Sequence, residues 1–412
     1  MLGAPLILWI GSMPVSRPNR PRFPRSLLLV LCCGVGFLAG CSDDDSGPIQ
    51  PVPGGEDVAQ GKQTFRFDTF GDETFWTDTL RMHEVIETGV SPQTALAVGL
   101  KVDADVLPPG TLESADLTDP ATTVALLKLD AVVGLKGTVQ RINGKDTLIA
   151  VGITCALCHS TVNNSVGHGI GSRLDGWPNL DLDPGAIIAL SPSLTADQKA
   201  VYQSWGPGKY DARYNFDGRN DPALIPPAYG LNGVHSVTYT GDGDRIAYWN
   251  RYVAVTQMHG HGSFTEPRLG INVSNPPDMV ESKLAALEAY QLSLASPPPP
   301  AGSFDAAAAT RGQAVFAGAG QCAGCHVGST LTDANSTLHQ PSEIPTDPTH
   351  AERSATKMYR TTPLRGLWAH APYFHDGSAP TLQDVVQRYD EAFSLGLTPA
   401  QMADLVEYLK SL

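Results

Sequence analysis

The hydrophobic positions of this chain predict a mainly α-helical protein that contains one clear β-hairpin. Residues 131–139 and 147–154 are runs rich in β-branched side chains, and Asn143-Gly144 lies between them. Asn-Gly between two such runs is the strongest short-range signal for a hairpin. Residues 61–86 are rich in aromatic side chains and are expected to be largely helical after Asp72, because such a segment needs a surface on which to be buried.

Helical periodicity is clear in the C-terminal third of the chain. Residues 278–294 carry apolar side chains at helical spacing and predict an amphipathic helix. Four prolines follow and cannot continue that helix, so residues 296–302 are expected to form a stiff linker. The linker would separate an N-terminal domain, residues 61–295, from a C-terminal domain, residues 303–412. The last helix is predicted to begin with a capping box at Thr398-Pro-Ala-Gln401.

The N-terminal pattern is that of an export signal. Four arginines between positions 17 and 25 precede the uncharged residues 26–40, a stretch too short to cross a bilayer comfortably as a permanent helix. The stretch ends in Leu38-Ala39-Gly40-Cys41, which resembles a bacterial lipobox, so residues 1–40 are expected to be removed and Cys41 to be lipidated. An ordinary cleaved signal is the alternative. Residues 41–60 are acidic and rich in Pro and Gly, which predicts a disordered tether.

Two short motifs indicate the chemistry, namely Cys155-Ala-Leu-Cys158-His159 and Cys322-Ala-Gly-Cys325-His326. A C-x-x-C-H sequence is the spacing for covalent attachment of a c-type haem, in which the two thiols bind the porphyrin and the histidine binds the iron. A shared Cys₄ zinc site or two thiol redox pairs would leave both histidines unexplained. The sequence therefore predicts two covalently bound c-type haems, with His159 and His326 as proximal ligands.

Cysteine use and charge agree with an exported cytochrome. Of the seven cysteines, Cys32 and Cys33 lie in the N-terminal signal, Cys41 follows it as the predicted lipidation site, and the others all lie in the two motifs. The formal net charge is −14, and loss of the four signal arginines would change it to about −18. This charge argues against nucleic acid as a partner and favours a redox partner protein. Contact with the membrane is expected through the lipid anchor only, on the periplasmic side or at the cell surface.

The predicted fold class is mainly α, with two c-type cytochrome domains. Residues 161–276 show little periodicity and many Gly, Asn, Asp and Pro residues, so the first domain is expected to be enlarged by long loops around its haem. The second domain has the element order of a class I cytochrome c: a helix containing Phe316, the haem motif, a long loop and a final amphipathic helix.

Residues 358–389 resemble the C-terminal signature of bacterial di-haem cytochrome c peroxidases and their MauG-like relatives. The most telling parts are Pro363-Leu-Arg, Ala371-Pro-Tyr-Phe-His-Asp-Gly377 and Thr381-Leu. The resemblance implies a distal iron ligand, Met in the peroxidases and Tyr in the MauG-like members, in the segment after the second motif. Tyr389 is the best match, on a helix capped by Thr381, and Met358 is the rival ligand.

Other side chains of the loops are weaker candidates. His375 is expected to form hydrogen bonds within its loop or to a haem propionate. Residues that could approach the first haem are His83, His168, Tyr229, His235, Met258, His259 and His261, and those that could lie between the haems are Trp177, Trp249 and Trp368.

Three functions are compatible with these predictions. The first is a peroxide-using oxidoreductase in which electrons pass from the C-terminal haem to the N-terminal haem. The second is a di-haem electron carrier without catalysis of its own, and the third is a di-haem oxygenase that uses O₂. The family resemblance favours the first.

Overall fold

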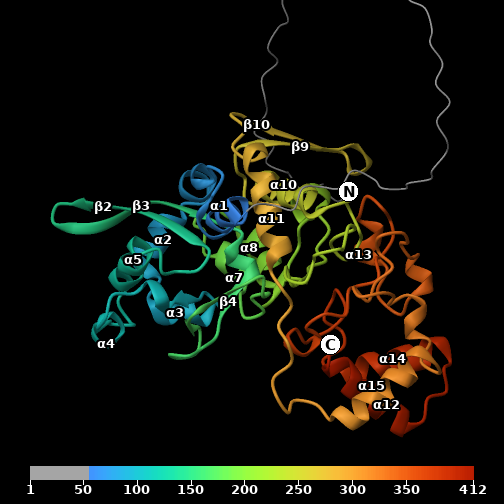
Figure 1. Ribbon diagram of the computed structural model, residues 1–412. Coiled ribbons are helices and arrows are strands. Elements are labelled where there is room, and N and C mark those ends of the chain that lie inside the picture. Colours follow the sequence, from blue (N-terminus) through green and yellow to red (C-terminus); the bar gives the residue numbers. More distant parts are fainter. Residues whose placement is uncertain (1–54) are drawn as a thin grey trace, which may run out of the picture. The chain divides into compact units, whose positions relative to one another are not determined.

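The computed structural model describes residues 55–412 (Figure 1). The predicted signal peptide, the lipidation site Cys41 and the first part of the tether lie outside the described residues. No helix between residues 55 and 412 is long and apolar enough to cross a membrane.

Helix α1 (Gly55–Phe67) begins inside the segment that was expected to be a disordered tether. It packs along α11 (Leu284–Ser293), and the two helices approach so closely that a Cβ atom at Gly61 would lie 1.9 Å from the carbonyl oxygen of Ala286. The rings of Phe65 and Tyr290 meet edge to face across the same contact, 5.5 Å apart. The buried part of α1 begins at Gly61, and residues 55–60 extend the same helix with exposed side chains apart from the half-buried Val58.

The predicted hairpin is confirmed. Strands β2 (Leu135–Ile142) and β3 (Lys145–Ile153) pair in antiparallel fashion, and Ile142 lies opposite Lys145. Asn143 and Gly144 form the turn with φ angles of 50° and 80°, the left-handed region that this type of hairpin requires. Strand β3 leads directly into α6 (Ala156–His159), so the first haem motif lies at a strand-to-helix junction, as expected.

The rest of residues 55–295 contains short elements joined by loops. Helix α10 (Ile246–Thr256) was not predicted, because three consecutive residues at its end are buried and no single apolar stripe marks it. The predicted amphipathic helix is present as η4 (Glu281–Lys283) followed by α11. The other helices are η1 (Thr74–Thr79), α2 (Met82–Gly89), α3 (Pro92–Ala97), η2 (Ala104–Val106), α4 (Thr111–Ser114), α5 (Pro120–Lys128), α7 (Pro184–Ala189), α8 (Ala196–Gln203), α9 (Tyr214–Asp217) and η3 (Pro267–Leu269).

Five two-stranded sheets occur in the described part of the chain, and the hairpin β2–β3 is one of them. Only β1 with β5 is a parallel pair; the other sheets are antiparallel. The remaining strands are β1 (Val102–Asp103), β4 (Ser160–Val162), β5 (Ile170–Gly171), β6 (Arg173–Asp175), β7 (Lys209–Tyr210), β8 (Ala223–Leu224), β9 (Gly262–Glu266) and β10 (Ile271–Asn275). The described chain is therefore mainly helical, as predicted.

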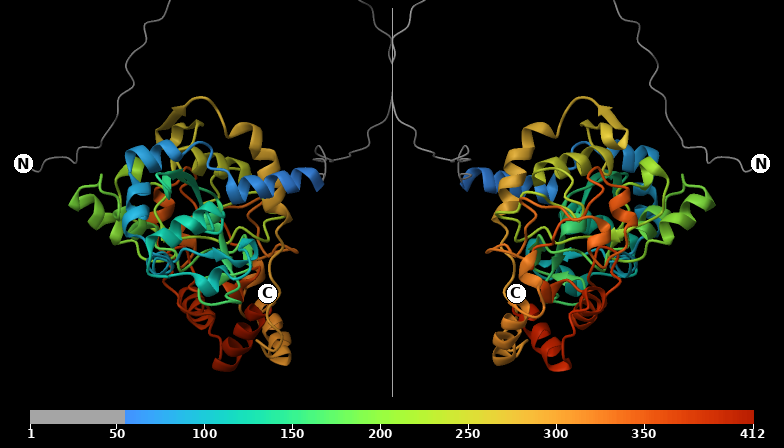
Figure 2. Two further views of the ribbon diagram at one scale, coloured as in Figure 1. Left: turned by 90° about the vertical axis from the view of Figure 1, so that its left-hand side faces the viewer. Right: turned by 90° about the vertical axis from the view of Figure 1, so that its right-hand side faces the viewer.

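Three helices, orange and red in Figures 1 and 2, form the core of the C-terminal segment: α12 (Ala306–Ala317), α14 (Leu382–Phe393) and α15 (Pro399–Lys410). Gly312 lets α12 approach α15, because a Cβ there would lie 2.0 Å from the carbonyl oxygen of Asp404. Both predicted caps are present on α14 and α15. The shorter elements are η5 (Cys322–Gly324), η6 (Pro341–Glu343), α13 (Thr349–Glu352) and η7 (Leu367–Ala369).

Contacts join the segments on either side of the Pro-rich linker. Residues 296–302 contain no helix or strand, as expected of the linker. Arg353 nevertheless donates hydrogen bonds to both carboxylate oxygens of Asp211, at 3.0 and 2.9 Å, and to Asp217 at 2.7 Å. The described residues all lie in one compact unit, so the division into two domains stays a prediction.

Candidate haem sites

The second motif opens onto a large cavity. Cys322 follows α12 through a tight turn in which Gln321 has a φ of 54°. Cys322, Cys325 and His326 all line a cavity of about 500 Å³. This volume lies within the range of about 300–1,000 Å³ that is usual for sites of small molecules and cofactors.

The walls of this cavity are mainly apolar and come from both halves of the chain. Helices α12, α14 and α15 contribute Phe316, Leu382, Val386, Leu405 and Leu409, and the N-terminal half contributes residues 224–227 and 229–231. A porphyrin is a flat apolar ring that carries two carboxylates on one edge. Apolar walls around two thiols and an imidazole therefore suit a covalently bound haem.

The ring of His326 is oriented as an iron ligand needs. Its Nδ1 atom lies 3.0 Å from the carbonyl oxygen of Leu331, and its Nε2 atom has no hydrogen-bond partner among residues 55–412. Burial lowers the pKa of His326, which favours the neutral imidazole. A histidine that ligates a metal typically donates its other ring N–H to a carbonyl or carboxylate, which fixes the tautomer and the ring orientation. Nε2 is then free to bind iron.

His159 of the first motif has the same arrangement. Its Nδ1 atom lies 3.1 Å from the carbonyl oxygen of Pro226, and burial lowers its pKa to about 4. Loop backbone after the motif is fixed to it, because Gly176 N donates to the carbonyl of His159 at 2.8 Å and Asn179 N donates to that of Cys158 at 2.9 Å. The donor set of Cys155, Cys158 and His159 therefore also suits a c-type haem.

Of the two predicted distal ligands, one lines the cavity. Tyr389 on α14 shares it with His326, whereas Met358 is not among the residues of its wall. The Tyr389 ring lies 6.1 Å from that of Phe374 and 5.7 Å from that of Phe393. Burial raises the pKa of Tyr389 to about 12, so the phenol is neutral near pH 7.

The other histidine and methionine candidates differ in how deeply their side chains are buried. His168 and His235 are exposed, and Met258 is buried among apolar side chains. His259 stacks on Phe75 with the ring centroids 3.6 Å apart, and burial lowers its pKa to about 4. His83 is on α2, and His261 has its Nδ1 atom 3.1 Å from the carbonyl oxygen of Pro276.

The side chain of His375 forms hydrogen bonds to residues of other segments and not, as was predicted, within its own loop. Its Nδ1 atom lies 3.2 Å from the hydroxyl of Thr346, and its Nε2 atom lies 3.4 Å from that of Tyr359. His375 also lines the cavity.

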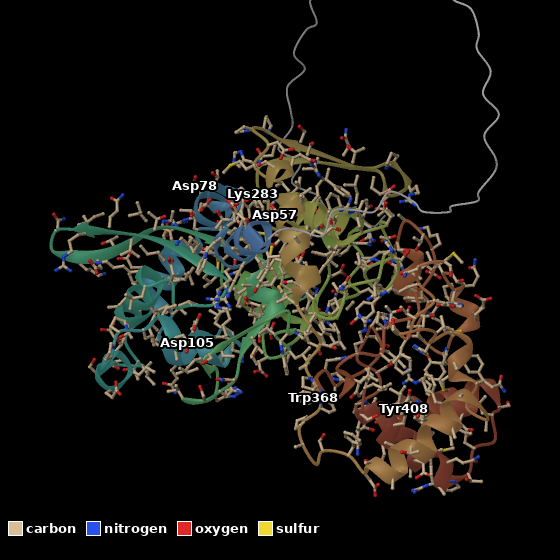
Figure 3. All side chains as sticks on the ribbon, in the orientation of Figure 1. Asp57, Asp78, Asp105, Lys283, Trp368 and Tyr408 are labelled. Atoms are coloured by element: carbon tan, nitrogen blue, oxygen red, sulfur yellow. The ribbon has the colours of Figure 1, made fainter. Side chains whose placement is uncertain are left out.

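Two of the three candidate tryptophans meet. Trp177 lies 5.7 Å from Trp368, ring centroid to ring centroid, and 5.9 Å from Tyr229, in edge-to-face arrangements. Tyr229 lines the cavity and donates a hydrogen bond to the carbonyl of Gly366 at 3.2 Å. Trp249 instead stacks on Tyr252. Figure 3 labels Trp368, which lies in the C-terminal segment.

Sequence reasoning missed two buried polar side chains of the cavity wall, Arg360 and His370. The Nε atom of Arg360 and the Nε2 atom of His370 are buried and have no hydrogen-bond partner among the described residues. Burial lowers the pKa of His370 to about 4, and a hydrogen bond to the backbone of Arg365 opposes this shift. No local motif marks these residues. Whether their nitrogen atoms find hydrogen-bond partners depends on segments distant in the sequence.

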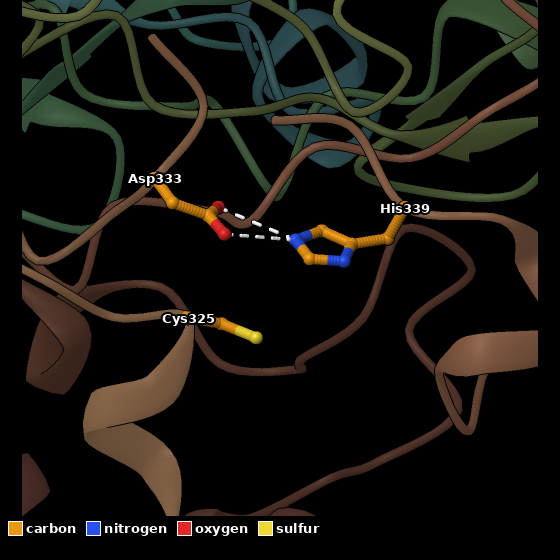
Figure 4. Close-up of side chains that lie close together, drawn as sticks. All are labelled: Cys325, Asp333 and His339. Carbon is orange, nitrogen blue, oxygen red and sulfur yellow. Dashed lines mark hydrogen bonds and ion pairs between the residues drawn. The ribbon is translucent and has the colours of Figure 1, made fainter. Parts of the chain in front are cut away.

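A third group beside the second motif has the composition of a metal site. Ligand atoms of Cys325, Asp333 and His339 all lie within 4.8 Å of one another, and His339 Nε2 lies 3.0 Å from an Asp333 oxygen (Figure 4). A covalently attached haem would convert the Cys325 thiol to a thioether, which is a much weaker ligand than a thiolate. With a haem attached, the cluster would keep only Asp333 and His339 as strong donors.

A comparison with known protein families matches one segment of the cavity wall. Residues 358–391 match the RoxA-like, cytochrome c-like family. Two solved structures are similar over part of the chain, each with a TM-score of 0.33. They are hydrazine synthase of Kuenenia stuttgartiensis, 21% identical over 47% of this chain and 73% of that one, and a MauG-like protein associated with microbial copper homeostasis, 19% identical over 47% and 74%. No curated protein matches the chain.

The matched segment is the one that builds much of the cavity. It contains Arg360, His370, His375 and Tyr389, all of which line the space beside Cys322, Cys325 and His326. The predicted resemblance of residues 358–389 to c-type cytochromes therefore agrees with the match of residues 358–391 to a cytochrome c-like family.

Proposed function

We propose that this protein is an exported di-haem c-type oxidoreductase that uses hydrogen peroxide. Cys155 and Cys158 attach one haem and Cys322 and Cys325 the other, with His159 and His326 as the proximal ligands. A lipid on Cys41 anchors the mature chain to the membrane, and a redox partner protein supplies electrons. The second and third predicted functions, an electron carrier and an O₂-using oxygenase, become outcomes of the tests below.

The aromatic contact between the two motifs carries this proposal. Trp177 follows Gly176, whose N–H is bonded to the carbonyl of His159, and its ring touches those of Trp368 and Tyr229. Edge-to-face rings at these separations are in van der Waals contact. Tyr229 lines the cavity of His326. The rings of Trp177, Trp368 and Tyr229 therefore connect the loop bonded to His159 with the wall of that cavity. An independent pair of electron carriers would not need this link.

The two sites differ in a way that suggests a direction. The cavity of His326 has a wall tyrosine, Tyr389, that can close the sixth iron position, and a closed iron suits electron transfer. The first motif is followed by loops that supply no ligand at a convincing spacing, and loops are where catalytic groups are often placed. We therefore assign electron entry to the site of His326 and peroxide reduction to that of His159.

The bound haems would supply the redox chemistry, in which hydrogen peroxide takes up two electrons and two protons and leaves as two water molecules. The chain's own residues fix both imidazoles through their Nδ1 atoms, exclude water from the cavity of His326 with apolar side chains, and hold Trp177 between the sites.

The test combines haem counting with ligand binding. The intact mass of the mature protein should exceed that of the polypeptide by two haems, and a Cys322→Ala/Cys325→Ala variant should lose one. Carbon monoxide should perturb the spectrum of one reduced haem per chain and should still do so in that variant, while peroxide turnover with an external donor falls at least tenfold. If neither haem of the wild type binds carbon monoxide or cyanide in any redox state, the protein is an electron carrier. Consumption of O₂ without peroxide turnover would indicate the oxygenase instead.

A further inference from the structure

We propose that Arg360 binds a carboxylate of the haem held by Cys322, Cys325 and His326, and that this contact positions the haem and raises its reduction potential. The inference rests on the proposed haem content of this site but not on the peroxide reaction. Arg360 acts on the iron only through the porphyrin and is therefore a positioning residue.

Backbone contacts fix Arg360 in the cavity wall. Its N–H donates to the carbonyl of Tyr239 at 3.0 Å, and the preceding residue, Tyr359, pairs with His339 in a β-bridge. The guanidinium Nη1 donates to the carbonyl of Ser236 at 2.9 Å. Arg360 is 9% exposed, so its side chain lies in the wall and not at the surface.

No carboxylate compensates this charge. Within residues 55–412 Arg360 forms no ion pair, and its Nε atom is buried without a partner. The titratable side chain that interacts electrostatically with Arg360 is that of Tyr239. This phenol is neutral, because burial raises its pKa. Arginine is seldom this buried unless it is paired, because removing a charge from water costs several kcal/mol unless an opposite charge repays it.

The other buried arginines show the usual arrangement. Arg353 is paired with Asp211 and Asp217, and Arg213 is paired with Asp242. Arg173 is paired with Asp103. Arg360 differs from these three because the missing anion would have to come from the cavity that it faces.

The cavity has one source of carboxylate that its own chemistry provides. Haem carries two propionates, and the residues that attach haem line the same space as Arg360. A guanidinium offers two parallel N–H groups that match a carboxylate, and Nε of Arg360 is free for such a contact. A free carboxylate from solution has the same chemistry, and the experiment separates the two sources.

The contact has a consequence for electron transfer. A fixed positive charge beside the porphyrin disfavours Fe(III) relative to Fe(II), because oxidation adds a positive charge to the centre. Arg360 would therefore raise the potential of this haem.

The experiment measures potentials by spectroelectrochemical titration of the full-length mature protein. Arg360→Gln should lower the midpoint potential of one haem and leave that of the other unchanged, and Arg360→Lys should restore most of the loss. The propionate bending band in the resonance Raman spectrum should shift in Arg360→Gln. Arg311→Gln is the matched control, because it removes the same charge from an exposed pair with Asp404 and should change neither quantity.

Several outcomes would overturn the inference. Unchanged potentials and an unchanged Raman band in Arg360→Gln would exclude a contact with propionate. A wild-type potential that responds to added acetate, with no response in Arg360→Gln, would assign the site to a free carboxylate. If Arg360→Gln does not accumulate, Arg360→Lys still decides, because a shift of the propionate band is expected from the loss of the planar guanidinium. Absence of haem at this motif would instead refute the proposed function.

Discussion

The indole rings of Trp177 and Trp368 meet almost at right angles, with their centroids 5.7 Å apart and their planes at 79°. Trp177 belongs to the loop bonded to the first haem motif, and Trp368 belongs to the segment that builds the cavity of the second. The Nε1 atom of Trp368 donates to the carbonyl of Pro297 at 3.2 Å, so the Pro-rich linker holds this ring in place. The contact therefore joins the loop after the first motif to the segment that lines the cavity of the second.

Loss of this contact should slow electron transfer between the haems. In Trp177→Ala the indole is removed while the loop remains bonded to His159, so both haems should attach and keep their potentials. When the reduced protein is oxidised by peroxide in a pre-steady-state experiment, the haem at His326 should be oxidised at least tenfold more slowly than in the wild type. Trp249→Ala is the control, because Trp249 stacks on Tyr252 outside the bridge. Equal rates in the two variants would remove the bridge from the mechanism.

Tyr389 is expected to occupy the sixth iron position at the second motif. Tyr389→Phe removes the phenol oxygen but keeps the ring between Phe374 and Phe393, so the spin state of one haem should change in electron paramagnetic resonance. Met358→Leu should leave the spectrum unchanged, because Met358 does not line the cavity. If the spectrum changes in His370→Ala and not in Tyr389→Phe, the free Nε2 of His370 is the ligand.

Asp72 should make stability fall as pH rises. It accepts from the N–H of Ile153, and burial raises its pKa to about 9, with Glu73 and Asp68 acting in the same direction. The folded protein therefore keeps a proton that the unfolded chain loses near pH 4. Its contribution is fully present below about pH 4 and is lost as pH rises toward 9.

The measurement is the free energy of unfolding in urea between pH 5 and pH 9. Asp72→Asn keeps an oxygen for Ile153 and removes the ionisation, so the decline over this range should become shallower. Asp116→Asn is the control, since Asp116 is exposed and hydrogen bonds from Thr118 lower its pKa out of the range. A decline as steep in Asp72→Asn as in the wild type would contradict the assignment.

Arg353 should contribute strongly to the stability of the whole chain. Its side chain and that of Asp211 are 1% and 2% exposed, and the pair joins the segments before and after the linker. Arg353→Met leaves the buried Asp211 carboxylate without its cationic partner, which should cost about 3–5 kcal/mol. Arg219→Gln, which breaks the exposed pair with Glu352, should cost less than about 1 kcal/mol. If Arg353→Met and Arg219→Gln lower the free energy of unfolding in urea by the same amount, burial of the Arg353–Asp211 pair does not determine its contribution to stability.

The local features of this protein were readable from the sequence. The C-x-x-C-H spacing, the Asn143-Gly144 turn and the caps at Thr381 and Thr398 each depend on residues a few positions apart, and the structure contains the turn and both caps where expected. The resemblance of residues 358–389 likewise needed no tertiary information, and it is the part of the chain that a cytochrome c-like family matches.

Features that depend on distant partners were decided by the tertiary structure. The sequence left Trp177, Trp249 and Trp368 equivalent, and it left Met358 as a rival to Tyr389. It gave no sign that Arg360 would be buried without a carboxylate, since the surroundings of Arg360 come from residues 236 and 239 as well as from its own segment. Spacing along a chain specifies turns, caps and covalent attachment, whereas packing and electrostatic compensation depend on which segments the fold brings together.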